Sequence, residues 1–358
     1  MRVCIIGSGL STLTLAKALV NQNIFVDILS SSNNYKIDES RTIGISKSNL
    51  DFFNENVLNI DKIAWKLKKI EIYTENLKNE KILNFENKKS QLFSILKNYE
   101  LYKILNKSLS KNKFCKKIKF KKKLINFNKY NLVINCDHSN YITKKYFNKK
   151  IIKTYNSFAF TSIIEHGKIQ NDTAIQIFTR RGPLAFLPLS KYKTSIVYSF
   201  NNYRGKTKID FNNLINQYNF KYKIEKIHKP EKFQLKSIIL RKYHNNKILA
   251  FGDILHRIHP LAGQGFNMTI RDVNIFLDIV KKKIDLGLPL DSLVNSEFEK
   301  ILRHKNYIFS NSIDLIHEFF NLERKLNNDI LSKSIKLLGK NTFINKMFTR
   351  IADKGLNF

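Results

Sequence analysis

The sequence lacks the features that mark several large classes of protein. Its three cysteines, Cys4, Cys115 and Cys136, show neither paired spacing nor a CxxC motif, so no disulfide framework or zinc site is expected. No apolar run reaches the length of about 18 residues that a transmembrane helix needs, and no charged leader precedes the first apolar strand. We therefore expect a cytoplasmic protein that does not span a membrane.

Motifs for hydrolytic or metal-dependent catalysis are also missing. The chain has no HExxH sequence and no Ser, His and Asp in the order of a known triad. His256 and His259 are three residues apart but precede a predicted helix rather than sharing one of its faces. We predict no metal site and no residue that drives hydrolysis.

Basic residues greatly outnumber acidic ones. The 63 Lys and Arg residues against 29 Asp and Glu residues give a formal net charge of +34, which is typical of proteins that bind nucleic acid or anionic membranes. Lysine is abundant in every predicted kind of element, however, and an AT-rich coding sequence would produce the same excess. The basic run at 111–123 has no recognised nucleic-acid module around it, so no nucleic-acid partner is predicted.

The hydrophobic pattern predicts an α/β fold. RVCIIG, SGLSTLTLAKALVNQN and IFVDILS, within residues 2–30, predict a strand, a helix after a glycine turn, and a second strand. Further along, 68–86 alternates like a hairpin, 99–110 has helical spacing, 155–200 predicts successive strands, and 265–283 and 291–358 are largely helical. A βαβ unit followed by an antiparallel sheet and a helical C-terminal part is the expected order.

The turn between the first strand and helix, GSGLST (7–12), has the context of a dinucleotide-binding GxGxxG motif. Gly7 suits the tight turn, and Gly9 would let a pyrophosphate approach the helix N-terminus. Thr12 occupies the third glycine position, and Ser30 stands where an acidic residue would bind a ribose. Taken alone, the segment is also compatible with a βα turn that binds nothing.

Residues 248–280 contain no lysine, although the chain has 52 and about five are expected there by chance. A carboxylate after a buried strand can accept hydrogen bonds from a sugar-like chain, and a glycine-bounded helix start can face a planar ring that gains negative charge. A lysine side chain would obstruct both. A corner that needs glycines only for its turns is the alternative. The candidate cofactor residues are Gly252, Asp253, Pro260, Gly263, Gln264, Gly265, Phe266 and Asn267.

HPLAGQGFNMTIRDV (259–273) resembles the second flavin-binding motif of the FAD-dependent aromatic hydroxylases with the p-hydroxybenzoate hydroxylase fold. In this form it is similar to the branch that hydroxylates polyprenylated phenols in ubiquinone biosynthesis, the UbiH/UbiF-like proteins. IQNDTAIQIFTRRGPLAFLPLS (169–190) resembles the substrate sheet of that branch. RTIGIS (41–46) resembles the loop whose arginine, here Arg41, lies near the flavin.

The resemblance implies a Rossmann-like FAD-binding domain interleaved with an antiparallel β-sheet substrate domain. The expected parts are 1–67, 96–150 and 241–290 for the FAD-binding domain, 68–95 and 151–240 for the substrate domain, and 291–358 for C-terminal helices. The implied activity is ring hydroxylation of a polyprenylated phenol in ubiquinone biosynthesis through a flavin C4a-hydroperoxide. It would use O2 and an electron donor, either NAD(P)H or a reductase. Pro183 and Phe186 are the candidate substrate residues, with core packing as the alternative for Phe186.

Several residues depart from the pattern of that branch. Asp137 and His138 replace a DG motif, and Tyr102 replaces an arginine. Together with Thr12 and Ser30, these residues weaken the adenosine side and predict weak flavin retention. Two alternatives stay open, namely a flavin-poor structural member of a quinone-biosynthesis assembly and an FAD hydroxylase of another aromatic substrate.

The C-terminal segment 322–355 interleaves apolar and basic residues. An interfacial helix has this composition, so peripheral contact with the inner face of a membrane is expected. A solvated packing helix is the alternative.

Overall fold

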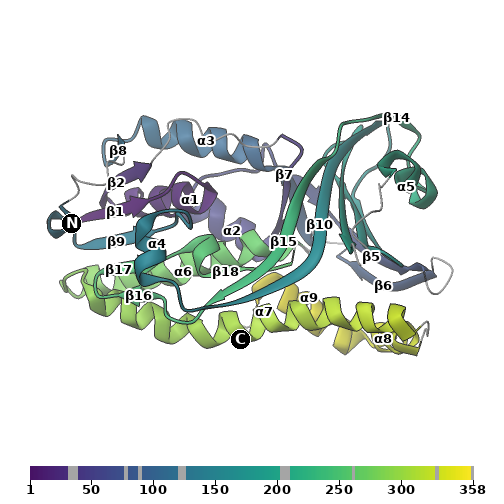
Figure 1. Cartoon of the computed structure of the whole chain (residues 1–358). Coiled ribbons are helices and arrows are strands. Elements are labelled where there is room, and N and C mark those ends of the chain that lie inside the picture. Colours follow the sequence, from purple (N-terminus) through teal and green to yellow (C-terminus); the bar gives the residue numbers. More distant parts are fainter. Residues whose placement is uncertain are drawn as a thin grey trace.

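A computed structural model describes residues 1–30, 39–75, 80–87, 91–119, 126–201, 210–259, 263–326 and 330–355. Two sheet-based halves lie side by side, and the long strands β10 and β15 run between them (Figure 1). Helix α7 (Ser292–Leu326) extends along both halves. The expected α/β architecture with a helical C-terminal part is confirmed.

The first half is a mainly parallel sheet built on the βαβ unit. β1 pairs in parallel with β2 on one side and with β9 on the other. The order is β16-β17-β9-β1-β2-β8, in which β16 runs antiparallel to β17. The strands are β1 (Arg2–Ile6), β2 (Phe25–Ser30), β8 (Cys115–Lys119), β9 (Leu132–Asn135), β16 (His244–Asn245) and β17 (Ile248–Ala250).

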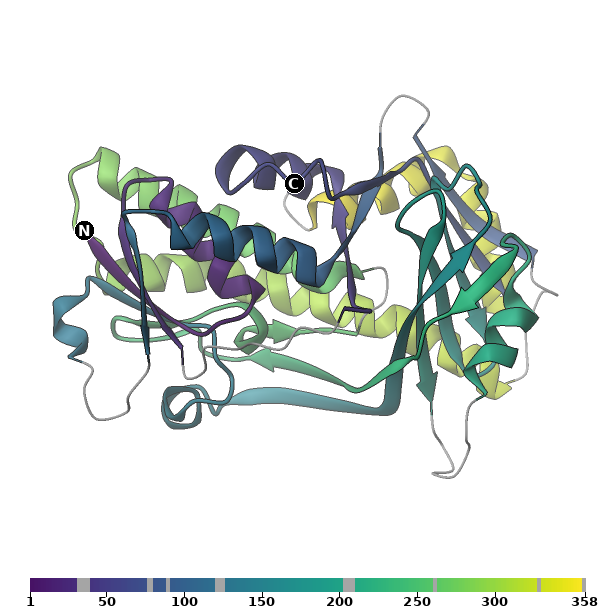
Figure 2. The same cartoon turned by 90° about the horizontal axis from the view of Figure 1, so that it is seen from above.

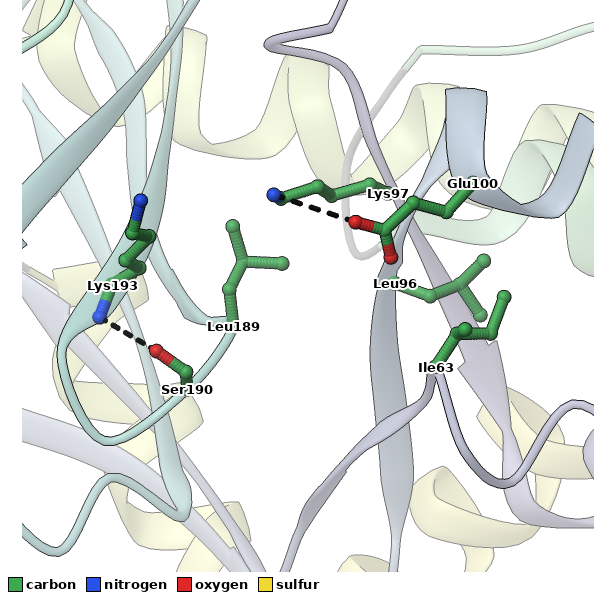
Figure 3. Close-up of a pocket in the computed structure, with 7 residues that line it drawn as sticks. All are labelled: Ile63, Leu96, Lys97, Glu100, Leu189, Ser190 and Lys193. Carbon is green, nitrogen blue, oxygen red and sulfur yellow. Dashed lines mark hydrogen bonds and ion pairs between the residues drawn. The ribbon is translucent and has the colours of Figure 1, made fainter. Parts of the chain in front are cut away.

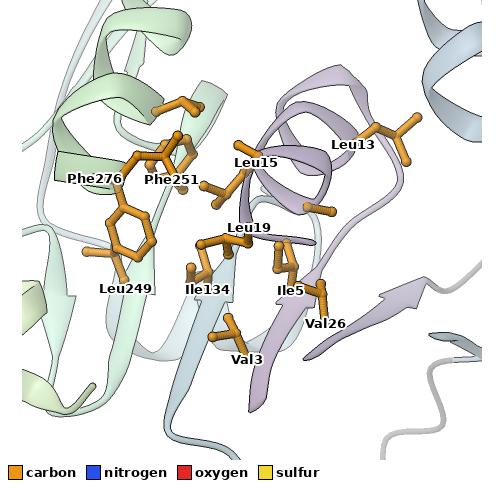
Figure 4. Packing of buried hydrophobic residues seen from close by; sticks show 14 of the residues in the cluster. Val3, Ile5, Leu13, Leu15, Leu19, Val26, Ile134, Leu249, Phe251 and Phe276 are labelled. Atoms are coloured by element: carbon orange, nitrogen blue, oxygen red, sulfur yellow. The ribbon is translucent and has the colours of Figure 1, made fainter. Parts of the chain in front are cut away.

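This sheet is covered by α1 (Leu10–Val20), which packs against α3 (Asn98–Ser110) and α6 (Gln264–Asp285). Strands buried on both faces read as continuous apolar runs, which explains why RVCIIG shows no alternation. Leu15 and Leu19 of α1 pack over Ile5, and Phe276 of α6 joins the same cluster (Figure 4). Each such fully buried side chain stabilises the fold by about 2 kcal/mol.

The second half is a sheet of antiparallel pairs, apart from the parallel pair β5 and β11. Its order is β18-β15-β10-β13-β12-β11-β5-β6, with β14 beside β10. The strands are β5 (Lys69–Thr74), β6 (Glu80–Glu86), β10 (Lys150–His166), β11 (Thr173–Thr179), β12 (Gly182–Pro188), β13 (Lys193–Asn201), β14 (Ile224–Ile227), β15 (Glu231–Leu240) and β18 (His256–Arg257). β18 belongs to this sheet although 241–290 was assigned to the FAD-binding part, and the other domain boundaries stay a prediction.

The strands β3, β7 and β4 form a small third sheet. Along the chain, β3 and β4 come between β2 and β5, and β7 comes between β6 and β8. The strands are β3 (Thr42–Ser46), β4 (Trp65–Leu67) and β7 (Phe93–Lys97). RTIGIS was expected to be a loop, and that expectation is wrong for Thr42–Ser46, because β7 supplies backbone partners along the whole stretch.

Helices cover both faces of the second half. The two-turn helix α5 (Phe211–Tyr218) packs over one face together with Leu184 and Phe186. On the other, Phe178 packs against Phe309 of α7. The remaining helices are α2 (Lys47–Asn56), α4 (Tyr141–Tyr146), α8 (Ile330–Lys340) and α9 (Thr342–Lys354), with short 3-10 turns at Phe127–Lys129 and Gly252–Ile254.

Candidate cofactor site

The carboxyl ends of the parallel strands meet at the start of α1. The Gly7 amide donates to the Leu29 carbonyl at 2.8 Å, and the Cys136 amide donates to the Ile6 carbonyl at 2.8 Å. Strand order reverses here, since β2 lies on one side of β1 and β9 on the other. Ligands of open α/β sheets bind in the crevice at such a switch point.

Gly7 has a φ of +139°, and a Cβ there would lie 2.6 Å from Thr12 Oγ1. Thr12 is itself only 1% exposed. The residue at the third glycine position therefore packs beneath the turn instead of projecting into the crevice. The structure describes no side-chain cap at Gly9, the residue before α1, so backbone amides of the first turn are available to an anion.

Gly252 joins the two glycine motifs. It has a φ of +64°, and a Cβ there would lie 2.6 Å from Ser11 Cβ in the first turn of α1. Asp253 follows with an exposed side chain, 3.7 Å from Arg257, which places a carboxylate at the rim of the same crevice. Burial raises the pKa of the Cys136 thiol to about 12, so the thiol beside Gly7 stays protonated at neutral pH.

The second motif builds the start of α6. Gly263 has a φ of +62° and lies so close to Gly44 of β3 that an added Cβ would be 3.6 Å from the Gly44 Cα. The amide of Asn267 is fully buried. Its Nδ2 donates to the Gly44 and Gly263 carbonyls, both at 3.0 Å, and its Oδ1 accepts from the Ser46 amide at 3.0 Å. These bonds fix the helix start against β3.

The end of α9 is held at the same place. The Ser48 amide, in the first turn of α2, donates to Asp353 Oδ1 at 2.9 Å, and Ser46 Oγ donates to the Asp353 carbonyl at 2.9 Å. Gln264 Nε2 donates to the Ala352 carbonyl at 3.2 Å. Figure 2 shows this end of the chain beside α2. We call these contacts the α9 clasp.

The other predicted cofactor residues are spread along the crevice. Ser30 ends β2 and is partly exposed. Arg41 is exposed, with its guanidinium 4.9 Å from the Phe233 ring centroid. Gly265 faces open space, and Phe266 packs 6.5 Å from Phe53, between ring centroids. Pro260 lies outside the described residues.

The two predicted substrate residues lie on opposite faces of the sheet. Phe186 is 2% exposed and stacks on Tyr222 at 5.9 Å, under α5, as the packing alternative expected. Pro183 pairs with Phe178, whose cluster includes Met268 of α6. Pro183 therefore lies on the face toward α6, while a substrate contact through Phe186 stays a prediction.

A buried polar cluster beside the flavin motif was missed. Tyr155 donates a hydrogen bond to Asp314 of α7, and its ring lies edge-on to His259 at 5.2 Å between centroids. Burial raises the pKa of Asp314 above its usual value. Tyr155 sits where the pairing of β10 with β15 shifts register, a bulge that no local pattern signals. His256 instead binds Asp272 at 2.5 Å, and the described residues hold no group of acidic, His or Cys side chains arranged for a metal ion.

A pocket opens between the start of α3 and the turn joining β12 to β13 (Figure 3). Its charged side chains have partners, since Lys97 lies 3.5 Å from Glu100 and Lys193 lies 2.8 Å from Glu165. The pocket lies between the two halves, and none of the glycines described above lines it. Its lining residues are Ile63, Leu96, Lys97, Glu100, Leu189, Ser190 and Lys193.

Comparison with known proteins agrees with this geometry. Residues 177–279 match the family described as FAD binding domain. The match covers less than a third of the chain, from β11 into α6. Its structure superposes on p-nitrophenol 4-monooxygenase PnpA from Pseudomonas putida with a TM-score of 0.77, 12% identity, and 99% and 98% of the two chains covered. It also superposes on Klebsiella pneumoniae HpxO complexed with FAD and uric acid, with a TM-score of 0.76, 12% identity, and 99% and 97% covered. The fold is that of the FAD-dependent monooxygenases.

A curated relative is the ubiquinone biosynthesis monooxygenase COQ6 of Dictyostelium discoideum, 24% identical over 260 residues. The match covers 58% of this chain and 52% of the relative, so the chain spans about half the length of that protein.

The residues present fit FAD. Two helix starts, those of α1 and α6, have glycines before them and no described side-chain cap. Gly7, Gly252 and Gly263 each stand where a Cβ would meet a neighbouring segment or strain the backbone. A bipartite ligand with a pyrophosphate at one end and an anionic ring at the other suits this pair of sites.

Proposed function

We propose that this chain is an FAD-dependent monooxygenase that hydroxylates the aromatic ring of a polyprenylated phenol in ubiquinone biosynthesis. The observation that carries the proposal is the close approach of Gly252 to Ser11, which brings Gly252 and Asp253 beside the first turn of α1. The similarity to COQ6 supports the substrate class. When bound, FAD supplies the redox chemistry that activates O2, with electrons from NAD(P)H or a reductase.

The chain's own residues would bind the cofactor, orient the substrate and exclude water from the site. The amides at the start of α1 would hold the pyrophosphate, and Asp253 would accept hydrogen bonds from the ribityl hydroxyls. The start of α6 would stabilise negative charge on the flavin ring. Pro183 faces the same side of the sheet as α6 and is the proposed wall of the substrate site.

The first test is flavin binding. Asp253 is exposed, so Asp253→Ala should leave the fold intact and weaken FAD binding at least tenfold in a reconstitution titration. Asp285→Ala, which removes an exposed carboxylate at the far end of α6, is the matched control and should bind FAD normally. Equal affinity in both variants would remove Asp253 from the site.

The second test is the reaction. Bacterial strains that each lack one ring hydroxylase of quinone synthesis are complemented with the chain, and the quinone pool is analysed by mass. Rescue of one step identifies the carbon that is hydroxylated. A flavin-loaded protein that rescues no strain would point to another aromatic substrate.

Ser30 and the Asp137-His138 pair favour a second candidate, a flavin-poor structural member of a quinone-biosynthesis assembly. Ser30 does not provide the acidic ribose contact expected of a tight adenosine site, and His138 stands where the DG motif has its glycine. This candidate predicts that the purified protein is colourless and that added FAD does not stabilise it. It also predicts that deleting the chain lowers the quinone content of the cell and that a flavin-site variant restores it.

We also propose that the protein works in the cytoplasm, at the inner face of the membrane, because a polyprenylated substrate resides in the bilayer. Within the described residues, no helix combines the length and apolarity needed to cross a membrane.

A further inference from the structure

The outer side of α9 carries apolar and basic side chains together. Phe343 is 74% exposed and Met347 is 41% exposed, and Lys346, Arg350 and Lys354 are exposed as well. With 3.6 residues per turn, these five side chains fall within about 100° of the helix circumference. The end of α8 adds Leu337, which is 68% exposed.

Other residues of α9 attach the helix to the protein. Asn345 Nδ2 donates to the Asn84 carbonyl of β6 at 3.0 Å, and Ile351 packs with the cluster that contains Ile82. The α9 clasp holds Asp353 on Ser46 and Ser48. Because these three contacts hold α9 in place, the helix cannot rotate about its axis without breaking them.

We propose that this outer side, here called the α9 face and made of Leu337, Phe343, Lys346, Met347, Arg350 and Lys354, docks on an anionic lipid surface. Apolar side chains alone would suit many partners, but basic residues interleaved with them are typical of helices that lie in a membrane interface. Asp353 is the acidic residue of α9, and its carboxylate accepts a hydrogen bond from Ser48 Oγ. The face is therefore complementary to anionic headgroups and can also insert apolar groups.

The high overall charge does not by itself explain such docking. Lysines are spread over the whole chain, and a general cationic attraction would not depend on which of them is removed. A specific face predicts that basic residues of α9 matter more than equally exposed ones elsewhere. The assignment does not depend on the proposed reaction, because docking is measured without turnover.

The experiment is co-sedimentation of the full chain with phosphatidylcholine vesicles that contain or lack phosphatidylglycerol. We expect binding only when the anionic lipid is present. Lys346→Gln combined with Lys354→Gln should lower partitioning roughly 20-fold at low salt, since each basic residue near an anionic surface contributes about fivefold. Phe343→Ser combined with Met347→Ser should leave residual binding that salt abolishes.

The end of α6 and the first part of α7 provide matched controls. Lys282 and Lys300 are exposed, and Leu286 and Leu293 are 71% and 60% exposed. Lys282→Gln with Lys300→Gln, and Leu286→Ser with Leu293→Ser, should bind vesicles like the parent. Equal losses in the α9 and control pairs would show general cationic attraction and overturn the proposal, as would full binding by both α9 pairs. Thermal melting confirms that each variant is folded.

Failure here and failure of the proposed function give different results. If the chain binds vesicles through α9 but rescues no hydroxylase strain, the docking proposal is supported and the proposed reaction is contradicted. If the chain rescues a strain but does not bind anionic vesicles, the proposed reaction is supported and the docking proposal is contradicted.

Discussion

The two glycine-bounded helix starts of the crevice are built in different ways. At α6, Asn267 makes hydrogen bonds to β3 and to Gly263, and Gln264 reaches the end of α9. At α1, the turn is held by strand pairing and by the packing of Thr12 and Gly252. The first is fixed by buried polar bonds between distant segments, the second mainly by close backbone approach.

This difference suggests how the two ends of a flavin would be held. A buried polar network that is fully bonded specifies one geometry, so the α6 end should be rigid and intolerant of change. Close packing without such bonds tolerates some substitutions, as Thr12 in a glycine position shows. The adenosine end is therefore where affinity can be tuned, and three predictions test the contrast.

The largest effect is expected at Asn267. Asn267→Ala leaves the Ser46 amide and the Gly44 carbonyl without a partner in a buried place, which should cost about 3 kcal/mol in the free energy of unfolding and release bound FAD. Asn295→Ala is the control, because Asn295 is also fully buried but bonds only the Asn246 carbonyl among the described contacts, far along the chain from the crevice. Urea titration and flavin content measure both. A variant of Asn267 that keeps its flavin would refute the rigid end.

An intermediate effect is expected at Gly252. Gly252→Ala strains a positive φ and also pushes a methyl group into Ser11, so it should destabilise by about 2 kcal/mol and weaken FAD binding. Gly287→Ala has nearly the same backbone angle, +66°, with nothing within 4 Å, and should cost about 1 kcal/mol. If the two variants melt alike, the contact between the glycine motifs is not tight.

The smallest effect is a gain at Ser30. Ser30→Glu places a carboxylate at the end of β2, where it could accept hydrogen bonds from a ribose, and should tighten FAD binding about fivefold. Ser30→Gln has the same length without the charge and should change affinity by less than about twofold. Fluorescence titration of the apoprotein distinguishes them. No gain with Glu would mean that the adenosine end is limited by something other than this contact.

The spacing of apolar residues predicted those helices and strands in which each face lies in a single environment, either the core or solvent. The βαβ unit, the hairpin of β5 and β6, and the helices α3 and α6 are confirmed, because each has a regular apolar pattern. Thr42–Ser46 was missed as a strand because its partner, β7, lies some 50 residues away. A pairing of that kind leaves no mark on the short segment itself.

The site was predicted in part for the same reason. Short local motifs were enough to identify Gly7, Gly252 and Gly263. All three have the positive φ that favours glycine. Tyr155 with Asp314, and Asp353 with Ser48, join residues 159 and 305 positions apart. Neither pair has a spacing that sequence alone could connect. Whether Gln264 and Asn267 also touch the cofactor stays a prediction, since their side chains already bond to the protein.

The α9 clasp also has a consequence for the order in which the site is made. Ser46 and Ser48 leave the ribosome long before Asp353, whose hydrogen bonds they need. The βαβ unit can pair as soon as its second strand is synthesised, but the start of α6 is completed only by a contact spanning most of the chain. Contacts between such distant segments form slowly. A nascent chain would thus display a finished nucleotide turn beside an unfinished ring site, and cofactor capture would follow synthesis of α9 rather than accompany that of the first domain.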